Sequence, residues 1–237
     1  MVETSERQPA SDQDWFLRAW QTYRKYRDLD YMFHSRVYAL LRRELAGAPP
    51  GFHFLDVACG DAVASAGALA GSAVGRYTGI DISRPALDLA RRELAALHCP
   101  VALIERDFPK ALADWWEPVD VVWIGQSLHH FLPDEKLAVM RDVRRILAPG
   151  GRFLIWEPTA LPGEDRAGWA DRLEAGRHTR LSGLDDAEWR TVIEHCRASD
   201  YPETADGWLA LGREAGFAHA RELFADPSEI ARVYGFR

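Results

Sequence analysis

Several features that mark particular protein classes are scarce or missing in this sequence. The three cysteines, Cys59, Cys99 and Cys196, lack paired spacing, which fits neither a disulfide framework nor a zinc site and suits a reducing compartment. No apolar run approaches the roughly 18 residues of a membrane span, and the N-terminus lacks a charged-then-apolar leader. These absences predict a cytoplasmic protein that does not act in a membrane.

Positive charge is also scarce. The chain has 29 Lys and Arg against 36 Asp and Glu, a net charge of -7, with no basic stripe of the kind that neutralises a phosphate backbone. We therefore expect a small-molecule substrate rather than a nucleic acid. With 237 residues, 47% of them hydrophobic, one substantial core with additions is expected; the oligomeric state stays open.

A run of small residues follows the first predicted strand. Phe54, Leu55 and Val57 indicate a short buried strand, and residues 58–64 then supply small side chains and one aspartate. Backbone amides in such a loop can approach a ligand closely. A second apolar strand ends at Asp81, 25 residues after Asp56 (81 minus 56), and nucleotide-binding α/β folds place a ribose-binding acid at a comparable distance.

Glycine is missing where a dinucleotide site needs it. The pattern G-x-G-x-x-G, read from position 58, falls on Ala58, Gly60 and Val63, and the branched third residue argues against a pyrophosphate site. A different pattern, acid-x-small-x-Gly-x-small, is met by Asp56, Ala58, Gly60 and Ala62.

Four later segments complete an ordered series with this loop. They are TGIDIS with Asp81, ERDFP with Asp107, VDVVWIGQSLHHF and LAPGGRFLIWEP, all before residue 159. The series resembles the motifs of class I S-adenosylmethionine-dependent methyltransferases of the small-molecule type, similar to the groups known as methyltransferase types 11 and 12. Ala58 and Ala62 stand where that family more often has glycine, which predicts a stiffer loop.

The resemblance implies S-adenosylmethionine as the cofactor and a set of residues that bind it. It assigns Asp81 to the ribose, Asp107 to the adenine amino group and Gln126 to the methionine end. A carboxylate only accepts hydrogen bonds and an exocyclic amine donates one, although a loop acid that caps the next turn is the alternative for Asp107. The full set is Asp56, Ala58, Gly60, Asp81, Ile82, Asp107, Phe108 and Gln126.

The catalytic candidates follow the fourth predicted strand and the fifth, which Glu157 and Pro158 are expected to end. His129 and His130 lie where the resembling family joins cofactor and acceptor, and imidazole, with a pKa of about 6.5, can act as a base or orient an acceptor. The alternative for His129 is a partly buried residue bonded to backbone. Tyr26 and Glu157 are predicted pocket contacts, with structural capping as the alternative for Glu157. No metal site is expected, because no nearby acid or histidine completes a recognisable spacing.

Alternating strands and helices predict an α/β fold. We expect a Rossmann-like three-layer sandwich whose seven-stranded sheet is mostly parallel, with its last strand antiparallel. Residues 1–48 are predicted to form a helical cap. Its first helix starts at Asp14, with the aromatic residues on one face and Arg27 pointing away from that face, and its second helix runs from Asp30 through Leu45. Residues 49–237 would form the methyltransferase domain, carrying a helical lid at about 159–201.

The predicted function is in-line transfer of a methyl group to a small-molecule acceptor. Because the sulfonium is already activated, the protein needs only to align nucleophile, methyl carbon and sulfur and to exclude water. For a protonated nucleophile it must also supply a base. The sequence does not distinguish an oxygen, nitrogen, carbon or sulfur nucleophile. Two alternatives stay open: another use of the cofactor, such as cyclisation or aminocarboxypropyl transfer, and a cofactor-binding subunit without catalysis.

Overall fold

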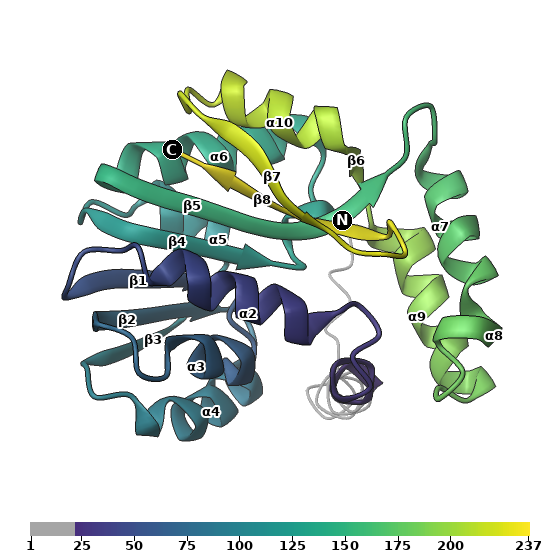
Figure 1. Cartoon of the computed structure of the whole chain (residues 1–237), viewed down its shortest axis with the longest axis horizontal. Coiled ribbons are helices and arrows are strands. Elements are labelled where there is room, and N and C mark those ends of the chain that lie inside the picture. The colour runs from purple at the N-terminus through teal and green to yellow at the C-terminus, as the bar shows by residue number, and fades with distance from the viewer. Residues whose placement is uncertain (1–21) are drawn as a thin grey trace, which may run out of the picture.

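The computed structural model describes residues 22–237, and a twisted sheet runs through their centre (Figure 1). Within these residues the sheet has eight strands, seven of them in the continuous order β3-β2-β1-β4-β5-β8-β7, while β6 (Glu203–Thr204) pairs only with β5. The seven strands are β1 (Phe52–Val57), β2 (Val74–Asp81), β3 (Val101–Glu105), β4 (Val119–Gly125), β5 (Leu147–Ala160), β7 (Ala220–Ala225) and β8 (Ala231–Phe236). The pairs among β1 to β5 are parallel and β8 is antiparallel to both neighbours. The predicted fold class is confirmed.

Helices cover both faces of the sheet and make three layers. Side chains that alternate along a strand face opposite sides, so Leu55 packs toward one layer and Phe54 toward the other. One layer contains α5 (Phe108–Ala113), α6 (Pro133–Ile146) and α10 (Ala205–Glu214); the other contains α2 (His34–Leu45), α3 (Val63–Leu69), α4 (Arg84–Glu93) and the 3-10 turn η1 (Leu94–Ala96).

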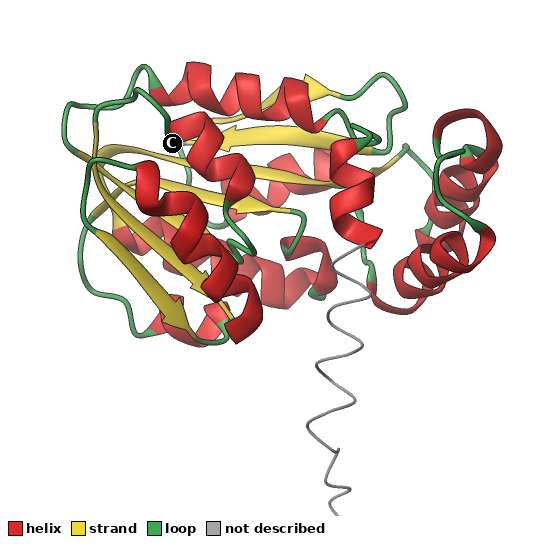
Figure 2. Cartoon of the chain, turned by 90° about the horizontal axis from the view of Figure 1, so that it is seen from below, coloured by secondary structure: helices red, strands yellow, loops and turns green. Residues whose placement is uncertain are grey.

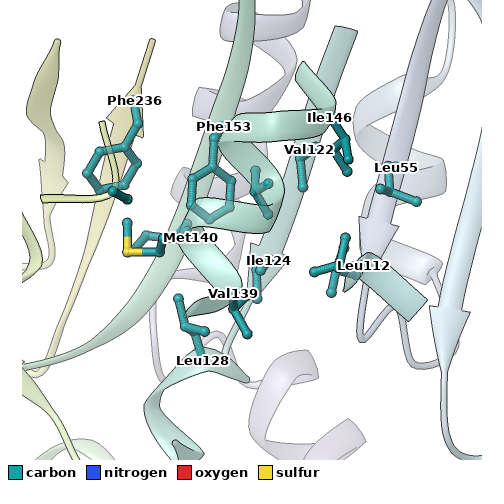
Figure 3. Close-up of a cluster of buried hydrophobic side chains, with 14 of the residues drawn as sticks. Leu55, Leu112, Val122, Ile124, Leu128, Val139, Met140, Ile146, Phe153 and Phe236 are labelled. Atoms are coloured by element: carbon teal, nitrogen blue, oxygen red, sulfur yellow. The ribbon is translucent and has the colours of Figure 1, made fainter. Parts of the chain in front are cut away.

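The first of these layers contains the core shown in Figure 3. Val122 and Phe153 of the sheet meet Leu112 of α5 and Met140 of α6, and each of the four is fully buried. Burial of one such side chain stabilises the fold by about 1.5–3 kcal/mol relative to exposure. This rigid packing fixes the positions at which the neighbouring strands end.

The predicted second helix begins later than expected. The sequence places its start at Asp30, but α2 begins at His34, because Asp30 and Phe33 have left-handed φ angles of 55° and 60° that no α-helix contains. The Asp30 carboxylate instead accepts hydrogen bonds from the amide and hydroxyl of Ser35. The preceding helical segment occupies residues 22–28 of the described chain, and its predicted start at Asp14 lies outside the described residues.

The fifth strand is longer than expected. Glu157 and Pro158 were predicted to end it, yet β5 continues to Ala160 and pairs with β8 through both residues. Strand β4 has already ended opposite Trp156, so Pro158 has a regular strand neighbour on one side only, and proline is tolerated there because no ladder donor is needed on the other.

Three helices follow β5 and lie beyond the end of that strand (Figures 1 and 2). They are α7 (Arg166–Ala175), α8 (Arg177–Arg180) and α9 (Asp186–Ser199). Their buried side chains, among them Trp169 and Ile193, form a separate cluster that also contains Tyr26 of the N-terminal helical segment. None of the described helices is long and apolar enough to cross a membrane.

Candidate active site

The loop after β1 turns tightly through three left-handed residues. Ala58, Gly60 and Ala62 have φ angles of 54°, 55° and 54°. Glycine adopts this conformation freely, whereas an L-residue there costs roughly 1–2 kcal/mol. The Gly60 amide donates to the Asp81 carboxylate over 2.8 Å, and Ala62 leads directly into α3. The loop therefore presents backbone and very short side chains at the edge of the sheet.

Asp56, at the end of β1, is 2% exposed. It accepts a hydrogen bond of 2.7 Å from the Tyr77 hydroxyl. Burial, assisted by the negative charges of Asp81 and Asp61, raises the pKa of Asp56 to about 7, against the opposing hydrogen bonds from Ser65 and Tyr77. A cationic ligand next to this carboxyl group would therefore favour its ionised form.

The ends of β2 and β3 carry the next pair of acids. Asp81 accepts from the amides of Gly60 and Ser83, each over 2.8 Å, and burial raises the pKa of its carboxyl group. Beside it, Ile82 is 71% exposed. The Asp107 side chain is 46% exposed and its only described charged contact is Lys110, at 3.8 Å.

Phe108 starts α5 directly after Asp107. Its ring is 8% exposed and meets Phe131 edge-on, with centroids 5.2 Å apart. The described Asp81, Ile82, Asp107 and Phe108 line neither of the two cavities below, but lie together along the ends of adjacent parallel strands. We call these strand ends the rim. Exposed Ile82, between Asp81 and Asp107 on the rim, suits contact with a flat heterocycle whose edges carry polar groups.

A cavity of about 140 Å³ lies next to the loop. Asp56, Ala58, Gly60 and Gln126 line it, as does Arg27 of the N-terminal helical segment. The Arg27 guanidinium forms an ion pair of 2.9 Å with Asp61 of the loop. Arg27 was expected to point away from the aromatic face, but it lies one helical turn after Tyr23 and lines this cavity together with it.

A second cavity, of about 330 Å³, adjoins the first, and Tyr23 and Gln126 line both. Its walls come from the N-terminal helical segment, α7, α9 and the segment after β4. Tyr26 lines it and is 8% exposed. Its other lining residues within the described chain are Thr22, Met32, His129, His130, Pro158, Trp169, Leu173, Thr191, Val192, His195, Cys196, Asp200 and Ile230.

Gln126 lies where the cavities meet and has a left-handed φ of 58°. Its backbone amide donates to the Trp156 carbonyl over 2.8 Å and its side-chain amide contacts the same oxygen at 3.2 Å. Strand β5 therefore holds the turn that separates the two cavities.

His129 belongs to the 3-10 turn η2 (Leu128–His130) and is held by Glu157. Its Nδ1 lies 2.6 Å from Glu157 Oε2, so this carboxylate acceptor places the proton on Nδ1 and leaves the Nε2 lone pair free. The same carboxylate accepts from the amides of Ser127, Leu128 and His129. Glu157 is 0% exposed and does not line the cavity, so the structure corrects its predicted role from substrate contact to positioning of His129.

His130 meets two residues that the sequence analysis missed. Asp200 follows α9, and its Oδ1 lies 3.3 Å from His130 Nδ1, 3.5 Å from His129 Nε2 and 3.9 Å from His195 Nε2. Burial alone would lower the pKa of His130, but Asp200 holds that pKa above its ordinary value. Only the packing of α9 against η2 brings these groups together, and sequence spacing carries no signal of it.

Residues 54–151 match a protein-family model described as "Methyltransferase domain". This stretch of the chain is therefore similar to methyltransferase domains. The match agrees with the predicted resemblance and supports the predicted enzyme class and cofactor.

Individual proteins similar to this chain include a sequence relative and solved structures. The chain is 26% identical over 186 residues to a carboxy-S-adenosyl-L-methionine synthase of Chromohalobacter salexigens, covering 73% of this chain and 64% of that protein; the chain thus spans less than two thirds of that relative. An O-methyltransferase family protein from Burkholderia thailandensis superposes with a TM-score of 0.63 at 17% identity, over 90% of this chain and 58% of that one.

A second similar structure was solved with S-adenosylhomocysteine bound. CalO1, a methyltransferase of calicheamicin biosynthesis in its S-adenosylhomocysteine-bound form, has a TM-score of 0.56 at 15% identity, over 85% of this chain and 53% of that one. At these identities both structures establish the shared fold.

Proposed function

We propose that this methyltransferase moves the methyl group of S-adenosylmethionine to a small, largely apolar acceptor that carries one ionisable nucleophile. The observation that carries the proposal is the meeting of the two cavities at Gln126, beside the imidazoles of His129 and His130. One cavity is polar and small, the other is apolar and larger, and a methyl group would cross where they join.

The smaller cavity suits the methionine end of the cofactor. That end carries a carboxylate and an ammonium group, and the cavity offers the Arg27 guanidinium and the Asp56 carboxyl as complementary charges. Charge-assisted hydrogen bonds of this kind are the strong ones. We assign the adenosine to the rim, with Asp81 at the ribose, Ile82 and Phe108 against the base, and Asp107 at its amino group.

The larger cavity suits the acceptor. Its volume of about 330 Å³ lies at the lower end of the range for small-molecule sites, roughly 300–1,000 Å³. Tyr26, Trp169, Leu173 and Val192 give it apolar walls. Among the described residues that line it there is no lysine or arginine, which disfavours an anionic acceptor.

His129 is the proposed base. Its Nε2 removes the proton of the acceptor, whose freed electron pair forms the bond to the methyl carbon as the carbon–sulfur bond breaks. The pair of that broken bond stays on sulfur, giving neutral S-adenosylhomocysteine, and the imidazolium that forms is stabilised by Glu157 at 2.6 Å. A positioned base of this type accelerates a reaction about 10²–10⁴-fold.

Mass spectrometry of the products tests the proposal. With a panel of neutral phenols, thiols, amines and carbon acids, we expect S-adenosylhomocysteine together with one methylated acceptor. His129→Ala should lower kcat by about 10²–10⁴ and leave the cofactor Kd unchanged, whereas His178→Ala, on the exposed face of α8, should change neither. Methylthioadenosine as the product, or tight cofactor binding without any turnover, would contradict methyl transfer.

A second candidate follows from the carboxy-S-adenosyl-L-methionine synthase relatives. A chain of that activity would attach a carboxyl group to the cofactor and would need an anionic source of that group, such as a carboxylate or bicarbonate. The lack of lysine and arginine in the described lining of the larger cavity argues for methyl transfer instead. Detection of a carboxylated cofactor in the same product analysis would favour this second candidate.

A further inference from the structure

The cluster beside the larger cavity has the composition of a metal centre. His129, His130 and Asp200 each offer one ligand atom, and these atoms all lie within 4.8 Å of one another. His195 Nε2 adds a fourth donor 3.9 Å from Asp200 Oδ1. Three imidazoles and one carboxylate form a donor set that divalent transition metals prefer.

The spacing of the donors also fits. Metal–ligand bonds of about 2.0–2.1 Å in a tetrahedral zinc site place neighbouring ligand atoms about 3.4 Å apart. Asp200 Oδ1 lies 3.3 Å from His130 Nδ1 and 3.5 Å from His129 Nε2. His195 Nε2, at 3.9 Å from Asp200 Oδ1, would have to move closer to the other donors to complete a tetrahedral site.

Asp200 Oδ1 is buried among imidazoles without an aligned hydrogen bond. Asp200 is 3% exposed, and within the described chain this oxygen has no hydrogen-bond partner of acceptable geometry; the nearest charge partner is His130 Nδ1 at 3.3 Å, which also contacts the Ser199 carbonyl at 3.2 Å. A buried polar atom without a partner is costly. A cation between this oxygen and the imidazoles would satisfy it.

The surroundings hold the donors in place. Glu157 fixes the His129 ring through Nδ1, the arrangement by which carboxylates orient histidine ligands of metals. The Tyr201 amide donates to the His129 carbonyl over 2.8 Å, and the buried Lys136 ammonium donates to the Tyr201 carbonyl. The segment that carries Asp200 is thus attached to η2 through backbone groups.

We propose that His129 Nε2, His130 Nδ1, Asp200 Oδ1 and His195 Nε2 bind a divalent transition-metal ion, with zinc as the best match, at the wall of the larger cavity. The ion would take the place of the proton through which His130 Nδ1 contacts the Ser199 carbonyl. All four residues line that cavity, so an acceptor there can reach the ion. This differs from the sequence expectation of no metal site, which considered only donors near the histidine pair in sequence.

The catalytic consequence rests on the proposed function. An acceptor hydroxyl or thiol bound to the ion would lose its proton to solvent at a lower pH than in water, and the resulting anion would attack the methyl carbon while the carbon–sulfur bond breaks toward sulfur. In that case His129 acts as a ligand. Without the ion, His129 acts as the base described above.

Direct metal binding tests the site without any acceptor. Full-length protein, freed of its purification tag and dialysed against a chelator, is titrated with zinc chloride by calorimetry and with cobalt(II) by visible absorption. We expect one ion per chain and the intense absorption of tetrahedral cobalt(II). Asp200→Ala and His130→Ala should each weaken zinc binding more than about 100-fold, and Glu157→Gln about 10- to 100-fold.

Controls separate this proposal from the proposed function. His178→Ala should bind zinc as the unmodified chain does, and thermal melting should show that every variant is folded. Failure of the folded unmodified chain to bind zinc or cobalt, or equal affinity in Asp200→Ala, would overturn the metal site. Methyl transfer that persists in chelator-treated protein with no zinc affinity would overturn it as well and leave the proposed function standing. Zinc bound without turnover would support the site while the proposed function fails.

Discussion

The two cavities that meet at Gln126 are built in different ways. The smaller one is walled by a short left-handed loop and by charged groups such as Asp56 and Arg27. The larger one is walled by apolar side chains such as Trp169 and Val192 from helices outside the sheet. Backbone geometry at strand ends therefore shapes the cofactor side, and side chains of added helices shape the acceptor side. Changes on one side are expected to leave the other side's ligand unaffected.

The largest expected effect concerns Asp56 and the stability of the cofactor side. Its pKa is raised from 3.8 to about 7, so its contribution to stability is fully present below about pH 4 and is lost as the pH rises to 7. Asp56→Asn cannot ionise, and should raise the free energy of unfolding of the ligand-free protein at pH 8 by up to about 4 kcal/mol.

Chemical denaturation at about pH 4.5, close to the unfolded pKa, and at about pH 8, above the folded pKa, measures this difference. The gain should be small at the lower pH and full at the higher one, while cofactor affinity at pH 8 decreases because the negative charge is gone. An equal gain at both pH values would show that ionisation of Asp56 is not its cause.

The next largest effect tests the rim. Asp81→Ala should weaken cofactor binding more than tenfold, a loss above about 1.4 kcal/mol, because the ribose loses its proposed acceptor. Asp88→Ala removes an exposed acid of α4 and should leave the affinity unchanged. Calorimetric titration with S-adenosylhomocysteine measures both, and unchanged affinity in a folded Asp81→Ala protein would refute the ribose assignment.

A substitution in α9 tests the acceptor side. Val192→Ala removes two methyl groups from the wall of the larger cavity, and should reduce kcat/KM for the acceptor about tenfold with no change in cofactor affinity. Steady-state kinetics over a series of acceptors of increasing size gives the measurement. A cofactor affinity that falls in parallel would show that the two sides are not independent.

The smallest effect concerns the loop itself. Ala58→Gly removes the cost of a left-handed alanine and should stabilise the protein by about 0.5–1 kcal/mol, after allowance for the added freedom of the unfolded chain. Ala66→Gly in the middle of α3 should destabilise it by about 1 kcal/mol. Thermal unfolding distinguishes the two directions, and destabilisation by Ala58→Gly would show that this residue is not strained.

Much of the cofactor side was predictable because its residues are close together in sequence. A strand, a loop of small residues and an acid at the next strand end are local patterns, and Ser83 caps α4 as such patterns predict, accepting from the Ala86 amide. The late start of α2 was not predictable from apolar spacing, because the left-handed residues Asp30 and Phe33 keep that spacing while breaking the helix.

The acceptor side was less predictable for a different reason. Asp200 and His195 reach His130 only after α9 folds back onto η2, about 70 residues further along the chain. The apolar periodicity of α7, α8 and α9 does not predict the surface on which these helices pack. Glu157 was found as a candidate, but its role depends on β5 continuing beyond β4, which the proline in that strand concealed.

The continuation of β5 beyond the end of β4 has a consequence for the candidate active site. One strand accepts the Gln126 amide at Trp156, carries the carboxylate that holds His129, and then pairs with β6 at Thr159. Under the proposed function, the distance from methyl donor to imidazole would therefore be set along a single backbone in the interior of the sheet. A change in acceptor shape would then be met by the side chains of α7 and α9, which lie outside this strand, and would leave the groups that β5 holds in place.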